Sequence, residues 1–150
     1  MLNLPSANRK ILPTLPDKSV KLIIAPPPYE GVSDYIKSQR LSMEWFGIDI
    51  EQLRLLEIGA RSKRHRVSAS QDYLNQIRQA SGEFRRCLRP DGLCVIVIGE
   101  SSARRSMLPK IIDEISSSGL TKELDLNRTV SSQRRQAPSI VGEHLLIFSK

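Results

Sequence analysis

Residues 20–29 read Val-Lys-Leu-Ile-Ile-Ala-Pro-Pro-Pro-Tyr, which is a strand pattern followed directly by a run of prolines. Its first six residues form an apolar run rich in β-branched side chains, which is typical of a buried strand. Three consecutive prolines, Pro26, Pro27 and Pro28, end the run, because proline fixes φ and has no backbone N–H to donate to a neighbouring strand. The sequence therefore predicts a buried strand over residues 20–25 that ends in a rigid turn.

The rest of the chain alternates helical and strand-like patterns. From Gln71 to Leu88, apolar residues recur at helical spacing, which predicts an amphipathic helix with Ser70 as its candidate N-cap. A Pro-Asp-Gly turn at 90–92 then leads into residues 93–98, a continuous apolar run that indicates a strand buried on both faces. Further helices are expected over about 32–46, through Leu53 and Leu56 to Gly59, and over 107–115. Further strands are expected over about 121–127 and 144–149.

The order of these elements is strand, helices, strand, helix, strand, strand. It predicts an α/β fold with a mostly parallel sheet and an antiparallel last pair. The chain has 150 residues, of which 39% are hydrophobic, so we expect one modest core and a single domain over residues 1–150. Residues 1–19 contain three prolines and few periodic apolar positions, and they are expected to be mostly a loop that leads into the first strand.

The composition is basic. Lysine and arginine outnumber aspartate and glutamate by 23 to 16, a formal net charge of +7. This favours a phosphate-rich partner, although a basic protein without such a partner has the same composition. Cys87 and Cys94 have neither metal-ligand nor secreted-disulfide spacing and are expected to be reduced core residues, with no metal bound. The chain lacks the roughly 20 apolar residues of a membrane span and the apolar region of a signal peptide, which predicts a cytoplasmic protein without a membrane partner.

The proline turn and its surroundings resemble the SAM-dependent DNA amino-methyltransferases. That family's signature is Asp, Asn or Ser followed by Pro-Pro and an aromatic residue, directly after a strand of the form Leu-Ile-Ile, and residues 22–29 are similar to it. The resemblance continues through 15–24, 34–47, 88–92 and 143–150, so it covers most of residues 13–150. It implies a partial Rossmann-like methyltransferase fold that methylates an exocyclic amine in DNA, most like the N4-cytosine type, because that subgroup commonly carries Ser before Pro-Pro-Tyr.

The resemblance also implies which residues carry the chemistry. Hydrogen bonds that hold both amine hydrogens favour a pyramidal nitrogen with an available lone pair. The catalytic positions are Pro26, Pro27, Pro28 and Tyr29: the aromatic ring stacks on the flipped base, and a carbonyl near Pro27 accepts from its amine. Pro26 stands where the family has Asp, Asn or Ser, and it has no side-chain acceptor. Because loss of one preorganised hydrogen bond costs roughly 10²-fold to 10³-fold in rate, we expect an impaired enzyme.

The methyl donor implied by the resemblance is S-adenosylmethionine, which this fold class holds with a glycine-rich turn. The eight glycines, at positions 31, 47, 59, 82, 92, 99, 119 and 142, never form Gly-x-Gly. We therefore expect the target-base half of a methyltransferase, as a fragment, a split subunit or a degenerate copy. A second chain with the SAM-binding half is the expected partner besides DNA.

Several basic residues are candidates for binding DNA. Two arginine pairs lie next to predicted strand ends, on the edge where the proline turn is expected, which favours contact with phosphates. The basic loop over 61–66 is equally compatible with a solvated surface. The candidates are Arg61, Lys63, Arg64, Arg66, Arg104, Arg105, Arg134 and Arg135. Glu100 and Ser101 are further candidates to line the site, and Trp45 is expected in the core.

Other hypotheses remain open at this stage. The proline run is also compatible with a turn that only redirects the chain, or with a ligand for an aromatic groove. The chain as a whole is compatible with a non-catalytic nucleic-acid-binding module or partner subunit derived from the same fold. A third hypothesis is a chain that folds poorly alone, whose exposed strand edge at 20–25 drives association.

Overall fold

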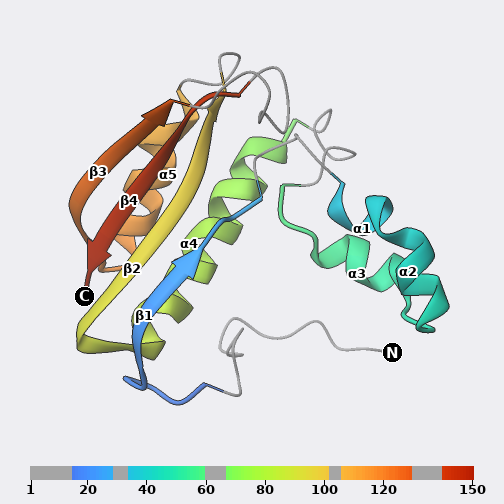
Figure 1. Ribbon diagram of the computed structural model, residues 1–150, viewed down its shortest axis with the longest axis horizontal. Helices are drawn as coiled ribbons and strands as arrows, with labels where there is room; N and C mark the ends of the chain where they lie inside the picture. Colours follow the sequence, from blue (N-terminus) through green and yellow to red (C-terminus); the bar gives the residue numbers. More distant parts are fainter. Residues whose placement is uncertain (1–14, 29–33, 60–66, 102–105, 130–139) are drawn as a thin grey trace.

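The computed structural model describes residues 15–28, 34–59, 67–101, 106–129 and 140–150. Its centre is a four-stranded sheet in the order β1-β2-β4-β3, formed by β1 (Val20–Ala25), β2 (Leu88–Ser101), β3 (Thr121–Thr129) and β4 (Ile140–Ser149) (Figure 1). β1 pairs parallel with β2, whereas β4 runs antiparallel to both β2 and β3. Three strands thus share one direction and the last is reversed, which confirms the predicted α/β class.

Two helices cover one face of this sheet, α4 (Ala69–Cys87) and α5 (Met107–Ser117) (Figure 1). The residues that fill the core between helices and sheet alternate along β2 and β4, and the register pairs Cys94 with Phe148 and Ile96 with Leu146. The helices contribute Tyr73, Leu74, Ile77, Ile111 and Ile115 to the same cluster. Both cysteines are fully buried and free, as expected.

Several predicted boundaries were wrong: β2 extends beyond residue 98 to Ser101, and β4 begins at Ile140 instead of residue 144. Helix α4 begins at Ala69, so Ser70 lies inside it, and the N-cap position belongs to Ser68, whose hydroxyl donates to Asp72 Oδ2 at 2.9 Å. The turn expected at 90–92 lies within β2, where the register passes from Val20–Leu88 to Leu22–Leu93. A Cβ on Gly92 would meet Leu88 Cδ2 at 2.9 Å and two backbone oxygens at 3.0 and 3.1 Å. Glycine is needed there because these neighbours leave no room for a side chain.

The segment 34–59 forms a small helical arm that projects from the sheet (Figure 1). It consists of α1 (Tyr35–Ser38), α2 (Arg40–Trp45) and α3 (Ile50–Leu56), so the single helix expected up to residue 46 is broken at Gln39. Gly47 ends α2 with a φ of 68°, in agreement with its predicted role. Trp45 is 88% exposed, and its expected place in the core was wrong, because so small an arm offers no core to enter.

Residues 15–19 contain no helix or strand, and Arg86 ties them to the end of α4. Its guanidinium donates to both carboxylate oxygens of Glu83 at 3.0 and 3.1 Å, to Asp17 Oδ1 at 2.6 Å and to the Leu15 carbonyl at 2.9 Å. Hydrogen bonds to Glu83 and Asp17 raise the pKa of Arg86, which stays charged. This contact sets where the chain enters β1. None of the described helices is long and apolar enough to cross a membrane.

Candidate functional site

Three strands run toward one edge of the sheet, which is therefore the candidate site. β2 and β3 end there at Ser101 and Thr129, and β1 runs in the same direction but ends earlier, at Ala25 opposite Ile96 of β2. The reversed strand β4 begins at the same edge, since Ile140 is paired with Ser101. In sheets of this kind, ligands bind outside the carboxyl ends of the strands.

The proline turn leaves this edge directly after β1. Pro26 is exposed, whereas Pro27 and Pro28 are half-buried. The hydroxyl of Tyr73 donates to the Pro28 carbonyl at 3.2 Å, and this tyrosine is only 1% exposed, near the start of α4. A buried hydroxyl bonded to a backbone carbonyl ties the turn to a rigid helix, so the turn is held in place by more than proline's own stiffness. Tyr73 belongs to the apolar stripe of the helix predicted over 71–88, but the sequence did not indicate this contact, because the contact depends on how α4 packs.

The other predicted site residues have different outcomes. Tyr29 and all eight basic candidates lie outside the described residues, so their roles stay predictions. Among the described residues, Ser101, Thr129 and Ile140 lie close together where β2 and β3 end and β4 begins, whereas Ala25 is paired with Ile96. Glu100 and Ser101 lie within β2, which extends beyond the predicted strand end at residue 98, and their role in lining the site stays a prediction.

A polar cluster on the helix-covered face was not predicted. His144 is 9% exposed, its Nδ1 lies 2.8 Å from Asp125 Oδ1, and its Nε2 lies 3.4 Å from Asn127 Nδ2. The three residues come from the neighbouring strands β3 and β4, and only their register brings them together. The cluster links the two strands through satisfied side chains, which is a structural role.

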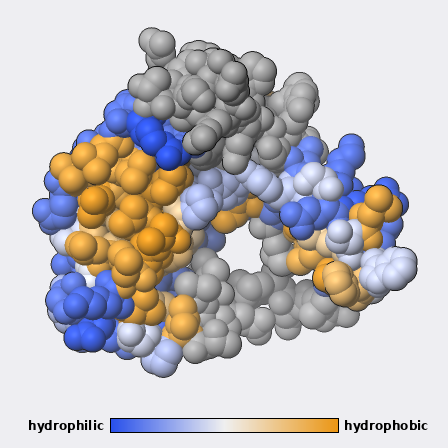
Figure 2. All heavy atoms as spheres, in the orientation of Figure 1, coloured by the Kyte–Doolittle hydropathy of each residue, from blue (hydrophilic) through white to orange (hydrophobic). Residues whose placement is uncertain are grey.

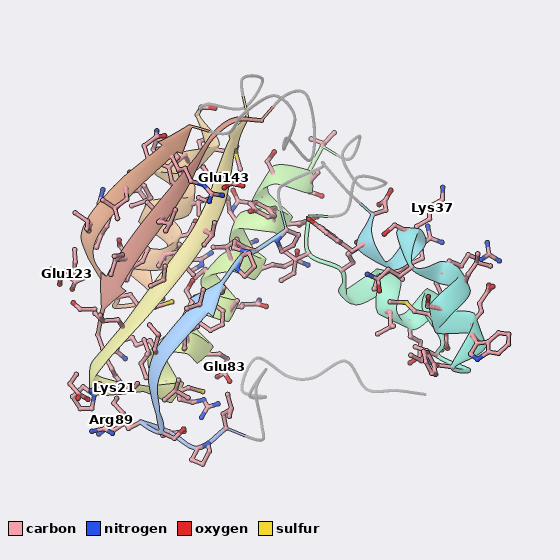
Figure 3. All side chains as sticks on the ribbon, viewed as in Figure 1. Lys21, Lys37, Glu83, Arg89, Glu123 and Glu143 are labelled. Carbon is pink, nitrogen blue, oxygen red and sulfur yellow. The ribbon has the colours of Figure 1, made fainter. Side chains whose placement is uncertain are left out.

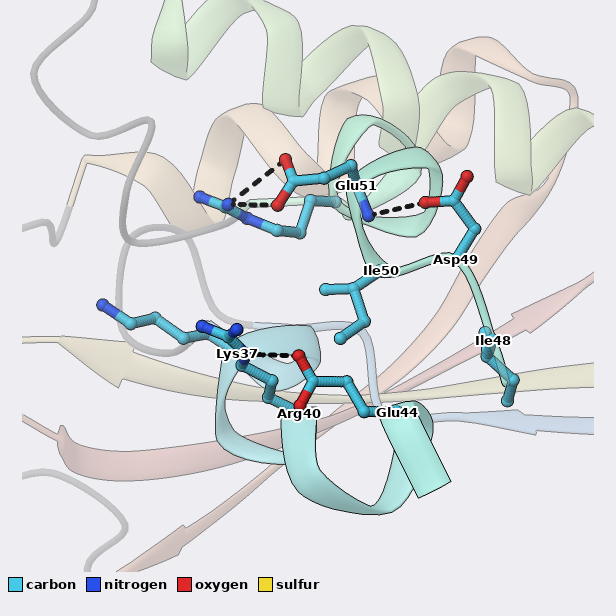
Figure 4. Close-up of a pocket in the computed structure, with 8 residues that line it drawn as sticks. Lys37, Arg40, Glu44, Ile48, Asp49, Ile50 and Glu51 are labelled. Carbon is cyan, nitrogen blue, oxygen red and sulfur yellow. Dashed lines mark hydrogen bonds and ion pairs between the residues drawn. The ribbon is translucent and has the colours of Figure 1, made fainter. Parts of the chain in front are cut away.

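The helical arm carries a pocket of about 460 Å³ that the sequence did not indicate (Figure 4). Two of its basic side chains are paired within it: Arg40 with Glu44 at 2.7 Å, and Arg54 with Glu51 at 3.1 Å. The hydrogen bond to Glu44 raises the pKa of Arg40. Because its charges are mostly neutralised locally, this pocket lacks the excess of one sign that a charged ligand needs.

The described residues do not fit a nucleotide-binding turn. Such a turn places glycines between a strand and the start of a helix, where backbone N–H groups meet the ligand. Within the described part of the chain, positive φ values at glycine occur at Gly47, Gly59 and Gly119, and each of these glycines follows a helix. These residues therefore end helices, and they offer no cradle for SAM.

The fold is similar to that of solved DNA modification methylases. TTHA0409 of Thermus thermophilus, assigned as a DNA modification methylase and crystallised with S-adenosyl-L-methionine, matches with a TM-score of 0.57 at 18% identity, over 93% of this chain and 49% of that one. The cytosine-N4-specific PvuII DNA methyltransferase matches with a TM-score of 0.52 at 15% identity, over 93% of this chain and 45% of that one. Neither a known family profile nor a curated protein matches the sequence.

The described elements form a mixed α/β fold that is similar to part of these solved DNA modification methylases. The predicted resemblance is thus confirmed at the level of the fold, which this chain shares with DNA modification methylases. The chain spans about half the length of the solved structures that it matches.

Proposed function

We propose that this chain is the target-base half of a SAM-dependent DNA amino-methyltransferase, present as a fragment, a split subunit or a degenerate copy. One observation carries the proposal: a Pro-Pro-Pro turn leaves the carboxyl end of β1, and the buried Tyr73 hydroxyl anchors it at the Pro28 carbonyl. A fold shared with DNA modification methylases supports it. We further propose that residues 1–150 make up one partial domain.

In the proposed reaction, the turn recognises the exocyclic amine of a flipped base. The Pro27 carbonyl accepts one amine hydrogen, and Tyr29 stacks on the base. Pro26 offers no side-chain acceptor for the second hydrogen, so the nitrogen is only half anchored. The expected penalty of roughly 10²-fold to 10³-fold in rate makes Pro26 the residue that decides between a slow enzyme and an inactive one.

DNA is the proposed substrate, and the net charge of +7 supports a polyanionic partner. The candidate phosphate contacts are Arg61, Lys63, Arg64, Arg66, Arg104, Arg105, Arg134 and Arg135. SAM is the proposed methyl donor, and it supplies an activated methyl group when bound. We propose that a segment outside the described residues holds it.

Binding of DNA with a weakened base pair tests base recognition without requiring catalysis. The chain is titrated into duplexes in which one cytosine or adenine is either paired or mismatched, and binding is followed by fluorescence anisotropy. A base that is already unpaired costs less to flip, so we expect about tenfold tighter binding to the mismatched duplex. A mismatched thymine is the matched control because it has no exocyclic amine.

Two variants separate recognition from general affinity. Tyr29→Ala should lose the preference for the mismatched duplex and retain salt-dependent binding, whereas Arg134→Ala should weaken binding to all duplexes equally. Equal affinity of the unmodified chain for paired and mismatched duplexes would contradict the proposal. Calorimetric titration of SAM into the chain, with and without duplex DNA, should give no heat of binding; clear binding would show a self-contained enzyme.

A second candidate function is a non-catalytic nucleic-acid-binding or partner module, and the proline at position 26 favours it. The two functions differ in what Pro26→Ser does. In the presence of a complementing SAM-binding half, a restored acceptor should raise methyl transfer to DNA if the chemistry is only impaired. If transfer stays absent in both proteins, the enzymatic function is rejected and the binding module remains.

A further inference from the structure

The face of the sheet opposite α4 and α5 is apolar and exposed, and no described helix covers it (Figures 1 and 2). Of its side chains, Leu22 and Ile24 on β1 are 52% and 65% exposed, Leu93 on β2 is 42% exposed, and Leu124 and Leu126 on β3 are 46% and 48% exposed. We call this surface the open face; its nine members are Leu22, Ile24, Leu93, Val95, Val97, Leu124, Leu126, Leu145 and Ile147.

Strand register makes the open face continuous. Leu22 is paired with Leu93, Val95 with Ile147, and Leu145 with Leu126, so aliphatic side chains meet across all four strands. With strands about 4.8 Å apart and about 3.4 Å per residue, these positions span an area on the order of 400 Å² once side chains are included. A continuous apolar patch of this size is comparable to the largest that monomeric proteins expose, and such patches are often functional. Figure 2 shows the patch over the sheet, with hydrophilic residues around it.

The two outer strands differ in a way that indicates where the occupant lies. β3 has charged side chains along its length, Lys122, Glu123, Asp125 and Arg128, and Glu123 lies at the outer edge of the sheet (Figure 3). Such charges protect a natural edge strand from further pairing. β1 reads Val-Lys-Leu-Ile-Ile-Ala, with Lys21 as its one charged residue. By composition, β1 is an interior strand whose second neighbour is absent from the described sheet.

The sequence of β2 leads to the same conclusion. Its run from Leu93 to Ile98 is apolar at every position, which predicts burial on both faces. The structure buries Cys94, Ile96 and Ile98 beneath the helices, but leaves Leu93 exposed on the other side. The expectation of burial on both faces is therefore wrong for this chain alone. Parallel α/β sheets are covered by helices on both faces, and the sequence of β2 is typical of a strand in such a sheet.

We propose that the open face and the free edge of β1 together dock a separate α/β polypeptide, which adds a strand alongside β1 and lays helices over the open face. Both features belong to one surface, because Leu22 and Ile24 lie on the strand that forms the edge. A single extended peptide could pair with β1 but could not cover side chains on four strands. The occupant must therefore supply strand and helix at once.

A second copy of this chain fits less well. Two copies stacked face to face would leave both β1 edges unpaired, and each carries a net charge of +7, which opposes their association. The solved structures of the same fold are about twice as long as this chain, with 93% of it matched to about half of theirs. A complementary half of similar size is the occupant that these lengths favour. That it binds SAM rests on the proposed function; the docking surface itself does not.

Site-specific photo-crosslinking in the native cell identifies the occupant. The photoreactive residue benzoylphenylalanine replaces Leu126 or Ile24 in the full chain, and Leu41 as the control, which is 83% exposed on the helical arm and outside the open face. Crosslinked proteins are identified by mass spectrometry, and the partner is then purified together with the chain. We expect both open-face positions, and not position 41, to crosslink to one separate polypeptide with a glycine-rich turn between a strand and a helix.

The purified pair then allows a quantitative test. Leu126→Lys should weaken the complex by roughly a hundredfold, because it would bury an unpaired ammonium, whereas Leu41→Lys should leave the affinity unchanged. Crosslinks to a second copy, to another part of the same polypeptide, or to nothing at all would each overturn the proposal. A pair that assembles through the open face but binds no SAM would retain the docking surface and reject the proposed function.

Discussion

Leu145 and Leu146 are adjacent in β4, and truncating each in turn should separate the two faces of the sheet. Leu146 is fully buried against α4 and α5, whereas Leu145 is partly exposed on the open face. Both changes remove the same atoms and have nearly the same effect on intrinsic strand propensity. Any difference between Leu145→Ala and Leu146→Ala therefore reports burial.

The expected magnitudes follow from this burial. Leu146→Ala leaves a cavity in a closed core and should lower the free energy of unfolding by about 2–5 kcal/mol. For a chain of 150 residues, a loss near 3 kcal/mol corresponds to a fall in Tm of roughly 6–12 °C. Leu145→Ala leaves no closed cavity, and its side chain is already partly hydrated, so the loss should be about 1 kcal/mol or less.

Urea unfolding followed by circular dichroism measures both values, provided that the slope of the transition is the same in the variants as in the unmodified chain. The expected result is a clear shift of the midpoint for Leu146→Ala and a small one for Leu145→Ala. Equal losses would mean that the face carrying Leu145 is covered in the isolated chain, and the reasoning that led to the docking surface would be refuted.

Three further changes test single features. Tyr73→Phe removes the bond to the Pro28 carbonyl and should lower stability by about 0.5–1.5 kcal/mol in urea unfolding; an unchanged midpoint would show that this bond does not hold the turn. Gly92→Ala forces a Cβ to within 2.9–3.1 Å of Leu88 and two backbone oxygens, so a loss of about 1–3 kcal/mol is expected, and a neutral effect would contradict the packing. Burial raises the pKa of the Cys94 thiol to about 12, and both cysteines are 0% exposed, so a thiol reagent at pH 8 should modify neither until urea unfolds the chain. The folded pKa of Cys94 exceeds its ordinary value of 9.0, so its contribution to stability is present below pH 9 and is lost as the pH rises toward 12. Cys94→Ala should abolish this loss of stability at high pH. Rapid modification of the folded chain at pH 8 would show that the strand is accessible.

The proposed function depends on a small difference at the proline turn. The turn keeps a rigid backbone at the carboxyl end of β1, together with its support from Tyr73, but Pro26 removes the acceptor that a serine or aspartate would supply. The backbone structure of the turn can therefore be kept even if the proposed reaction is lost. Pro26→Ser tests the reaction and Leu126→Lys tests the assembly through the open face, so the two proposals can fail independently.

The sequence by itself determined the elements and their class. The apolar runs at 20–25 and 93–98, the helical periodicity over 71–88 and 107–115, and the turn residue Gly47 are local signals, and local periodicity and backbone preference are enough to interpret them. The site edge also followed from the order of the elements, because parallel strands end on the same side of a sheet.

Tertiary structure alone decided the contacts that give the site and the surface their properties. The bond from Tyr73 to Pro28 joins residues 45 positions apart, and the cluster of His144 with Asp125 depends on strand register. The apolar run of β2 predicted burial on both faces, yet only packing revealed that one face is open. The physical reason is that periodicity shows which side chains require burial, whereas the number of layers in a sheet depends on which other polypeptide segments pack against it.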